Sequence, residues 1–319
     1  MGCKKGHLTE QERIIIQALR KEKFSNNAIS KRIGRDRRTV DREIERNLTS
    51  HGYQPRKARQ RYWRLHRKAQ YKKVDAKMLA YIKKRLLKEH SPEQISNSME
   101  KDFGSKISTR RIYDLVWENK KYGGELYKKL RIKNGKKRRK KRGSNAYRQQ
   151  IPHRVDIDER PEIANTRGRF GDWEADLVLG KKSTGGALVT LLERKSRLLL
   201  IGHVRRKTTK EVNAEIKRLL RPYRHVVETI TYDNGAEFKK HFKINKYLKC
   251  ESYFAKPYHA WERGANENAN GLIRQYIPKG ADMQQVTRRE LRFIMGRINN
   301  RPRKVLDYTT ANEVWLSVA

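Results

Sequence analysis

Three acidic residues, Asp176, Asp233 and Glu267, are candidates for a shared metal-binding catalytic site. Asp233 lies in TYDNGAEF, at the point where the apolar and β-branched run HVVETITY ends. In an open α/β sheet, reactive groups gather at strand ends. Carboxylates are ligands that Mg²⁺ and Mn²⁺ prefer, and two such ions about 4 Å apart support in-line displacement at phosphorus. The three residues therefore predict metal-dependent cleavage and transfer of DNA strands.

The first carboxylate of this set must be chosen among three neighbours. Asp172, Glu174 and Asp176 alternate with apolar residues in DWEADLVLG, so as a strand they share one face, and parity does not choose among them. Asp176 leads into the apolar run LVLG, which would carry it into the middle of a sheet. A bare carboxylate is costly there without a cation, which favours Asp176 as the ligand.

The other two carboxylates have ordinary alternatives. Asp233 precedes Asn-Gly, a common turn pair, and an Asp there can simply cap the following helix. In WERGANENANGLIRQY, Glu267 shares a helical face with Arg263, Asn270 and Arg274, and such a face can be solvated surface. If the helix projects over the sheet end, Asn270 and Arg274 would steady the carboxylate or meet phosphate.

The elements that would position these residues begin near residue 170. DWEADLVLG, GALVTLLER and SRLLLIGHV read as consecutive antiparallel strands separated by turn signals. TTKEVNAEIKRLLRPY predicts an amphipathic helix, VVETITYDNG a fourth strand, AEFKKHFKINKYLK a helix and CESYFAKPYH a short strand. WERGANENANGLIRQYI and TRRELRFIMGRINNR predict two more helices. The order βββαβαβα predicts an α/β RNase H-like core with a mixed sheet.

The N-terminal region predicts a helix-turn-helix. Thr9 and Glu12 have capping-box spacing, and the helix after them is expected to bury a face that includes Ile15, Ala18 and Leu19. Ser25 and Asp36 would cap two further helices, with Gly34 stopping the first of them. The third helix would bury Val40 and Ile44. Its residues expected to face a major groove are Arg37, Arg38, Thr39 and Arg42. The alternative is a helical hairpin with a solvated basic face.

A second helix-turn-helix-like unit is predicted further on. Ser91 would cap one helix and Ser108 the next, which would bury Ile112, Leu115 and Val116. This second helix would present Arg110 and Arg111 to DNA. Between the two units, Tyr62, Trp63 and Tyr71 alternate with Arg and Lys, which suits either a DNA-tracking arm or packing anchors.

The charge indicates a polyanionic partner. Lys and Arg number 78 against 35 Asp and Glu, for a formal net charge of +43. Basic residues release counterions from DNA, so double-stranded DNA is the expected partner, and a charged membrane surface is the rival. No apolar run is long enough to span a bilayer, and a soluble, intracellular protein without a membrane role is expected. Cys3 and Cys250 form no pair and receive no role.

These patterns predict a multidomain chain. A basic run from Lys136 to Arg142, which includes Lys137, Arg138 and Arg139, is expected to be an exposed linker that lies along phosphates; a nuclear-import signal is the competing interpretation. The predicted parts are a helix-turn-helix domain (1–50), a basic linker or arm (51–74), the second helix-turn-helix-like domain (75–130), a basic linker (131–165) and the RNase H-like core with its C-terminal helices (166–319).

Taken together, DWEADL, TYDNGAEF, WERGANENANGLIRQYIPKG and INNRPRKVLDYTTANEVW, behind GRDRRTVDREIERN, resemble the insertion sequence 30 family of bacterial transposases. The resemblance covers nearly the whole chain, and the 33 residues between Asp233 and Glu267 match the family spacing. It implies that Asp176, Asp233 and Glu267 form an Asp-Asp-Glu triad holding two Mg²⁺, which Mn²⁺ can replace. It also implies that the N-terminal units bind terminal inverted repeats.

The resemblance carries further expectations. Family members are expected to pass through a circular or joined-ends intermediate, to act as homodimers or larger homo-oligomers on paired ends, and to work in the bacterial cytoplasm, on the nucleoid when bound to DNA. The residues it implies at the substrate are Tyr258, Trp261, Arg263, Asn266 and Asn270, with Arg301 and Arg303 near DNA. Trp261 could equally be a core residue.

Other functional classes remain open on sequence grounds. A repressor with an inactive nuclease-like core would bind element ends without cutting. A plain RNase H-like nuclease would cut without joining and would have little use for two DNA readers. A structural chromatin-type protein would explain the charge but not the carboxylates.

Overall fold

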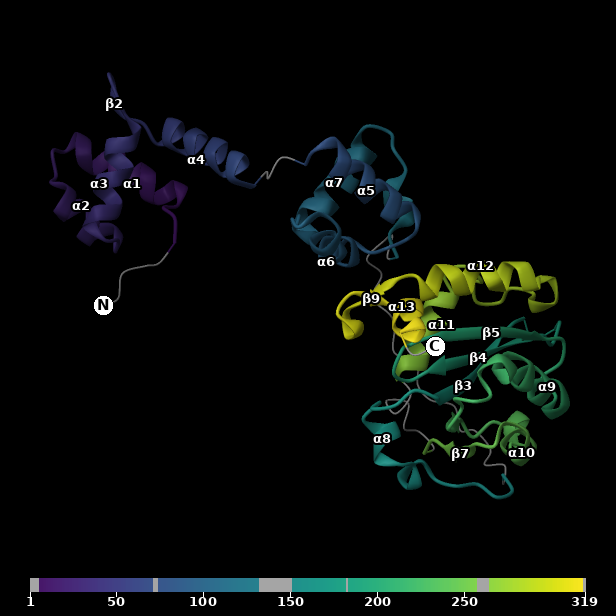
Figure 1. Cartoon of the computed structure of the whole chain (residues 1–319). Helices are drawn as coiled ribbons and strands as arrows, with labels where there is room; N and C mark the ends of the chain where they lie inside the picture. The colour runs from purple at the N-terminus through teal and green to yellow at the C-terminus, as the bar shows by residue number, and fades with distance from the viewer. Residues whose placement is uncertain (1–5, 71–73, 132–150, 182, 257–263, 318–319) are drawn as a thin grey trace. The chain divides into compact units, whose positions relative to one another are not determined.

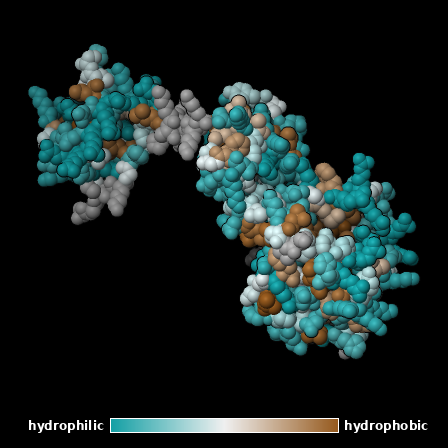
Figure 2. Space-filling model, viewed as in Figure 1, coloured by the Kyte–Doolittle hydropathy of each residue, from teal (hydrophilic) through white to brown (hydrophobic). Residues whose placement is uncertain are grey.

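The computed structural model describes the chain outside residues 1–5, 71–73, 132–150, 182, 257–263 and 318–319 (Figure 1). By its internal contacts it divides into two compact units, Met1–Ala76 and Lys77–Ala319. Most of the visible surface is hydrophilic, with hydrophobic residues in small separate patches (Figure 2). Among the described helices, none has both the length and the apolar character needed to cross a membrane.

The first unit contains the predicted helix-turn-helix. Its elements are α1 (Glu10–Lys21), α2 (Asn26–Ile33), α3 (Arg37–Asn47), β1 (Leu48–Thr49), β2 (Gly52–Tyr53) and α4 (Pro55–Gln70). The capping box of Thr9 and Glu12 and the caps at Ser25 and Asp36 are confirmed, and Gly34 ends α2 with a left-handed φ of 69°. Each cap satisfies a backbone N–H that the helix leaves without a partner, so local sequence sets these boundaries.

The buried face of α1 differs from the expected one. Ile16 and Leu19 are buried, whereas Ile15 and Ala18 are exposed. Three consecutive isoleucines leave the direction of the helix undetermined by hydrophobicity alone. The guanidinium of Arg35 binds both carboxylate oxygens of Glu12, at 3.0 and 2.9 Å. Because Glu12 lies one turn before Ile16, this contact favours burial of the helix face that carries both residues.

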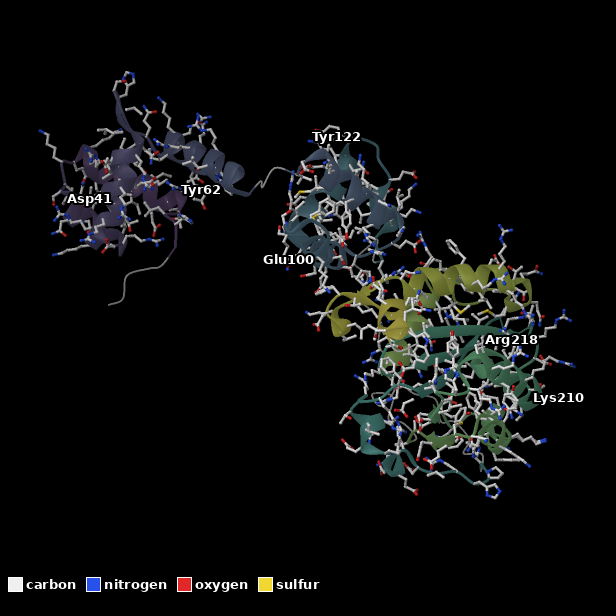
Figure 3. All side chains as sticks on the ribbon, viewed as in Figure 1. Asp41, Tyr62, Glu100, Tyr122, Lys210 and Arg218 are labelled. Atoms are coloured by element: carbon white, nitrogen blue, oxygen red, sulfur yellow. The ribbon has the colours of Figure 1, made fainter. Side chains whose placement is uncertain are left out.

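The segment expected to be an arm (51–74) is largely folded onto the first unit. Tyr53 and Ala58 are buried in the same core as α1 to α3. Tyr62, labelled in Figure 3, lies 5.2 Å from the guanidinium of Arg13 and makes an edge contact with His7. Tyr62 is therefore a packing anchor, while Trp63 is 54% exposed. Tyr71 lies outside the described residues.

The second unit begins with three helices, α5 (Ala76–Leu87), α6 (Pro92–Phe103) and α7 (Thr109–Lys121), followed by the short helix η1 (Leu126–Lys129). The predicted caps at Ser91 and Ser108 are present. Ile112 and Val116 are buried as expected, and Leu115 is half-buried. The helical character predicted for this region is confirmed.

These helices belong to the same compact unit as the β-sheet and form hydrogen bonds with the rest of that unit, so they are not a separate domain. The carboxylate of Glu89, just after α5, accepts hydrogen bonds from Arg301, at 3.3 Å, and from Tyr276. On α6, Gln94 donates to the carbonyl of Pro302 at 2.6 Å. Arg301 is only 4% exposed, so the expectation that it contacts DNA is wrong: its guanidinium ties the helices to the core.

The core is a five-stranded mixed sheet in the order β5-β4-β3-β6-β7. Its strands are β3 (Asp172–Leu179), β4 (Ala187–Glu193), β5 (Leu199–Val204), β6 (Thr229–Tyr232) and β7 (Glu251–Phe254). β3, β4 and β5 are antiparallel neighbours, while β6 and β7 run parallel to β3. With α9 (Thr209–Leu220), α10 (Phe242–Leu248) and α11 (Gly264–Ile273), the order is the predicted βββαβαβα of the RNase H-like fold.

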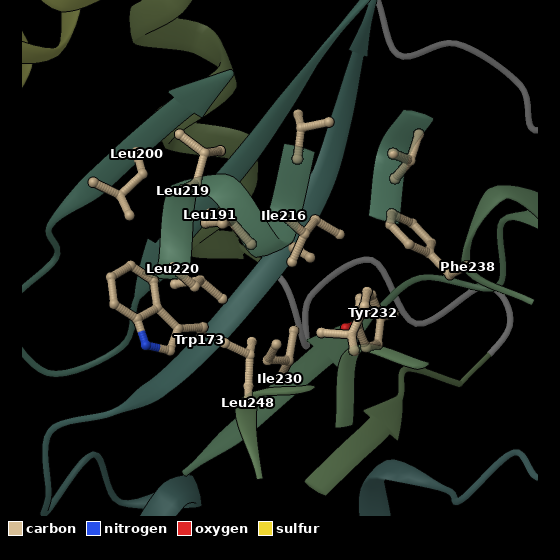
Figure 4. Close-up of a cluster of buried hydrophobic side chains, with 14 of the residues drawn as sticks. Trp173, Leu191, Leu200, Ile216, Leu219, Leu220, Ile230, Tyr232, Phe238 and Leu248 are labelled. Carbon is tan, nitrogen blue, oxygen red and sulfur yellow. The ribbon is translucent and has the colours of Figure 1, made fainter. Parts of the chain in front are cut away.

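Helices cover both faces of this sheet. On one face, α9 and α10 pack on Trp173, Ala175 and other residues of a core that Figure 4 shows in part. On the other face, α11 and α12 (Arg288–Asn299) pack on Val178 and Leu188. Successive residues of β3 alternate between these two cores, as the pleat requires. Asp172, Glu174 and Asp176 therefore face the α11 side.

Short elements complete the second unit. They are η2 (Ile157–Glu159), α8 (Glu162–Asn165), η3 (Arg221–Tyr223), η4 (Ala236–Phe238), η6 (Met283–Gln285), β8 (Pro302–Arg303), η7 (Lys304–Leu306), β9 (Thr309–Thr310) and α13 (Ala311–Leu316). Residues 151–165, expected to belong to a linker, pack on the sheet: Ile151 is in its core and the buried Arg160 donates to Thr231 Oγ1 at 3.0 Å. The basic residues Lys137, Arg138 and Arg139 lie outside the described residues.

His90 predicts a pH dependence of stability. It is 3% exposed, and burial together with nearby Arg and Lys side chains lowers its pKa to about 3. Below pH 6.5, the unfolded chain binds a proton at His90 that the folded chain rejects, so stability falls with falling pH, by up to about 1.4 kcal/mol per pH unit. We expect unfolding measured at pH 7 and pH 5 to show a smaller loss for His90→Gln than for the wild type. Equal losses would contradict this assignment.

Candidate active site

The sheet brings Asp176, on β3, and Asp233, the first residue after β6, toward the same end of two neighbouring strands. Parallel pairing joins Glu174 of β3 to Thr231 of β6, and the two aspartates each lie two residues further along. Parallel neighbours are about 4.8 Å apart, and residues two apart share a face. Both side chains are partly exposed. The fold thus brings together two carboxylates that are 57 positions apart in sequence, because β6 returns parallel to β3 after α9.

Helix α11 contributes directly to this site through Asn270. The side-chain amide of Asn270 donates from Nδ2 to Asp176 Oδ2 at 2.7 Å. Its Oδ1 is buried and has no hydrogen-bond partner among the described residues. Buried polar atoms in proteins nearly always have partners, so this oxygen marks a place where a further group is expected.

Glu267 lies on the same helix, one turn before Asn270, and is exposed. Residues three apart share a helical face, and three residues span about 4.5 Å of the axis. Within the part of the chain that the structure describes, no three His, Cys, Asp or Glu side chains are close enough to hold a metal ion. The triad thus stays a prediction: its third carboxylate is on the right helix but is not gathered with the other two.

The loop after β6, which carries Asp233, is held by one local and two long-range hydrogen bonds. The backbone N–H of Gly235 donates to Asp233 Oδ1 at 3.0 Å, which is the turn role that the sequence allowed for this residue. Asn234 donates to the carbonyl of Ala255, at the end of β7, at 2.7 Å. Arg154 in turn donates to Asn234 Oδ1 at 3.2 Å. The role of Arg154 was not predictable from the sequence, because no local pattern links it to a loop 80 positions away.

The two acidic neighbours of Asp176 are bound by arginines. Asp172 is fully buried, receives two hydrogen bonds of 3.2 Å from Arg169 and accepts one of 2.7 Å from Thr229. Glu174 is 2% exposed and forms an ion pair with Arg194. A carboxylate paired in this way already has its counter-charge. Asp172 and Glu174 are thus each bound to an arginine, and the choice of Asp176 as the site carboxylate stays a prediction.

The predicted recognition helix has the expected exposed side. Val40 and Ile44 are buried, while Arg38 and Arg42 are exposed and Thr39 is half-buried. The Arg37 side chain is 67% exposed and lies 3.6 Å from Asp41. These four predicted contact residues are placed where a major groove could be reached, and their contact with DNA stays a prediction.

The second helical region presents only one of its two predicted arginines. Arg110, on α7, is 87% exposed and pairs with Asp114 at 3.2 Å. The side chain of Arg111 is 17% exposed and pairs with Glu118 at 3.2 Å. Because most of the Arg111 side chain is buried, the structure does not place it on the exposed face with Arg110.

The residues around α11 that were predicted to contact DNA differ in burial and in hydrogen bonding. Asn266 is 2% exposed, so the expected direct contact with DNA does not fit this structure. Arg274 donates to the carbonyl of Leu179, the last residue of β3, at 2.6 Å and to that of Pro278 at 3.1 Å. It therefore joins the helix end to the strand end. Tyr258, Trp261 and Arg263 lie outside the described residues.

Comparison with known proteins gives the chain its relatives. A model described as a helix-turn-helix domain matches residues 4–47. A transposase for insertion sequence element IS4351 of Bacteroides fragilis is 42% identical over 96% of this chain and 94% of its own length. Transposase InsI for insertion sequence element IS30A of Escherichia coli (strain K12) is 31% identical over 97% of this chain and 83% of its own length.

A solved structure, the catalytic core domain of BIV integrase, aligns with a TM-score of 0.37 at 22% identity, over 46% of this chain and 95% of that one. The sequence relatives span nearly the whole chain, from the helix-turn-helix to the C-terminal helices. The chain belongs to the insertion sequence 30 family of transposases.

Proposed function

We propose that the chain binds the terminal inverted repeats of an insertion sequence as double-stranded DNA and catalyses divalent-metal-dependent strand cleavage and strand transfer, with Asp176, Asp233 and Glu267 as its catalytic carboxylates. The observation that carries the proposal is the 2.7 Å hydrogen bond from Asn270 to Asp176. It ties the helix that bears Glu267 to the strand that bears Asp176. Asp233, two residues past the last paired position of β6, supplies the second carboxylate.

The donor set fits Mg²⁺ or Mn²⁺. Asp176, Asp233 and Glu267 offer only oxygen donors, which these ions prefer over nitrogen or sulfur. The buried, unpartnered Oδ1 of Asn270 adds a nearby acceptor for a water or a hydroxyl. When two such ions are bound, they supply an activated oxygen nucleophile and stabilisation of the leaving oxygen.

The chain's own residues would fix the geometry. Asn270 holds Asp176 by one oxygen, and Gly235 holds Asp233 by Oδ1 through its backbone N–H. Asn234 and Arg154 anchor the loop that carries Asp233 to β7. Recognition of the repeat falls to Arg38, Arg42 and their neighbours on α3, whose exposed side chains can reach base edges and phosphates. Assembly as a dimer on paired ends is part of the proposal.

The test uses the full chain and a duplex carrying the terminal repeat of the element that encodes it. We expect a strand nick at the repeat end and joining of the freed 3′ end to a second duplex, both with Mg²⁺ and neither with EDTA. Binding of the repeat without Mg²⁺, with no cleavage after Mg²⁺ is added, would instead indicate a repressor. Cleavage without joining would indicate a plain nuclease.

Asn270 gives a graded prediction. Asn270→Ala removes the hydrogen bond to Asp176 while Ala maintains the helix, so we expect cleavage to fall roughly 10- to 100-fold, as for partners of metal-ligating groups. Asn270→Asp should be at least as damaging, because it sets a second carboxylate against Asp176. The matched control is Asn268→Ala, on the exposed side of the same helix. Equal rates for Asn270→Ala and Asn268→Ala in the cleavage assay would refute the role.

A further inference from the structure

A basic groove lies in the larger unit, and it is not part of the proposed catalytic site. It is a groove of about 760 Å³ between the end of α5, the outer face of α12 and α13. None of Asp176, Asp233 and Glu267 lines it. Helix α12 packs on β5, the edge strand two places from β3 in the sheet.

The groove is lined by cations from two segments that are distant in sequence. Arg85 and Lys88 come from the end of α5, and Arg292 and Arg297 from α12. Lys88 and Arg292 are exposed, and no ion pair involving either is found among the described residues. The lining carboxylate, Glu313, already accepts the backbone N–H of Thr310 in the capping box of α13. Arg85 is paired with Asp102 at 3.0 Å, so the net positive charge of the groove comes chiefly from Lys88, Arg292 and Arg297.

The lowered pKa of the buried His90, which also lines the groove, agrees with a positively charged surface there. The pKa of His90 falls to about 3 through its burial and through Arg85, Arg301, Lys88 and Arg297, in that order. Clefts lined by one sign of charge concentrate ligands of the opposite sign. Phe293 adds an apolar surface beside the cations: it is 59% exposed, with the guanidinium of Arg297 5.5 Å from its ring centre.

Gly296 supplies a different kind of observation. It lies within α12, lines the groove, and a Cβ built on it would meet nothing within 4 Å. Glycine inside a helix costs about 1 kcal/mol relative to alanine, and no neighbouring atom of the protein requires it here. A backbone without a side chain allows a ligand to approach closely, which is a common reason for glycine at such positions.

We propose that this groove holds the phosphate backbone of a second stretch of duplex DNA, distinct from the stretch cut at Asp176 and Asp233. The inference rests on the proposed function, since strand transfer joins two duplexes and each needs a place on the enzyme. Lys88 and Arg292 would contact phosphates from the two walls, and Gly296 would form the open floor between them. Such contacts read charge and shape and carry no base specificity.

The experiment measures binding of a random-sequence duplex to the full chain over a range of salt concentrations. Arg292→Glu should weaken binding roughly tenfold and lower the slope of log affinity against log salt by about 1. The charge-matched control is Lys246→Glu, exposed on α10 across the sheet, which should change both quantities far less. Equal effects of the two substitutions would overturn the proposal, because they would reflect net charge alone.

A second pair of variants tests the shape of the groove without changing charge. Gly296→Leu should weaken binding several-fold, while Gly296→Ala should change it little, and neither should lower the melting temperature, because both residues favour the helix. Equal affinity of the Leu and Ala variants would also overturn the proposal. If the wild type bound duplex but cut no element ends, the proposed function would fail, yet these comparisons would still decide whether the groove binds DNA.

Discussion

Asp233→Asn is expected to abolish strand cleavage, by roughly 10³-fold or more, while leaving repeat binding nearly intact. The substitution removes one negative charge and keeps the shape of the side chain. Its amide oxygen can still accept the hydrogen bond from the N–H of Gly235, so the loop after β6 should hold its form. What is lost is a charged oxygen ligand at a site where charge stabilisation dominates catalysis. Cleavage of a labelled repeat duplex measures the loss.

The same assay extends to the rest of the proposed triad. Asp176→Asn and Glu267→Gln should be as inactive as Asp233→Asn. Asp282→Asn, at the partly exposed N-cap of η6, should cleave at the normal rate. Gel-shift affinity for the repeat should be unchanged in all four. Normal cleavage by Asp233→Asn would show the central assignment to be wrong. Normal cleavage by Glu267→Gln alone would leave the two aspartates in place and move the third ligand elsewhere.

Arg194→Leu is expected to cause the largest loss of stability. The Arg194 side chain is 5% exposed, forms the ion pair with Glu174 and donates to the carbonyl of Ala164 at 3.0 Å. Without it, Glu174 is left as a buried charge without its counter-charge, which costs about 3–5 kcal/mol. For a unit of this size, that corresponds to a fall of roughly 10 °C in the melting temperature. Calorimetry of the transition of the larger unit would measure it.

Two further variants separate the loss of charge pairing from the loss of packing. The double variant Glu174→Leu with Arg194→Leu should recover much of the lost stability, because a buried ion pair replaced by apolar residues is often nearly neutral. Glu174→Gln should cleave DNA at close to the normal rate per folded molecule, in contrast to Asp176→Asn on the same strand face. A double variant no more stable than Arg194→Leu would rule out the ion pair as the cause.

The sequence alone was sufficient for most of the secondary structure. Helix starts at Thr9, Ser25, Asp36, Ser91 and Ser108 were predictable because a capping side chain and the N–H groups it binds lie within three residues. The order βββαβαβα followed from the change of hydrophobic period near residue 170. The predicted buried face of α1 was wrong, because three consecutive isoleucines do not indicate which of them faces the core. The contact of Arg35 with Glu12 favours burial of Ile16.

The tertiary structure alone decided how the helices of residues 76–121 relate to the core. Their capping and hydrophobic pattern suggested an independent domain, and nothing local in Glu89 or Arg301 reveals that the two residues meet. An ion pair between positions more than 200 apart leaves no periodic trace in the sequence. The same reason explains why Arg301 was expected at DNA and is found buried.

For the proposed site, the sequence predicted the kinds of residue and their order: an aspartate on a strand, a second at a strand end and a glutamate on a later helix, within a strongly basic chain. Strand parity alone left open which of Asp172, Glu174 and Asp176 was the catalytic candidate, and the apolar run LVLG after Asp176 favoured that residue. The folded chain adds their partners: Arg169 binds Asp172, Arg194 binds Glu174, and Asn270 donates to Asp176. Strand alternation is a local property of the backbone, whereas the partner of each carboxylate depends on which segments the fold brings together.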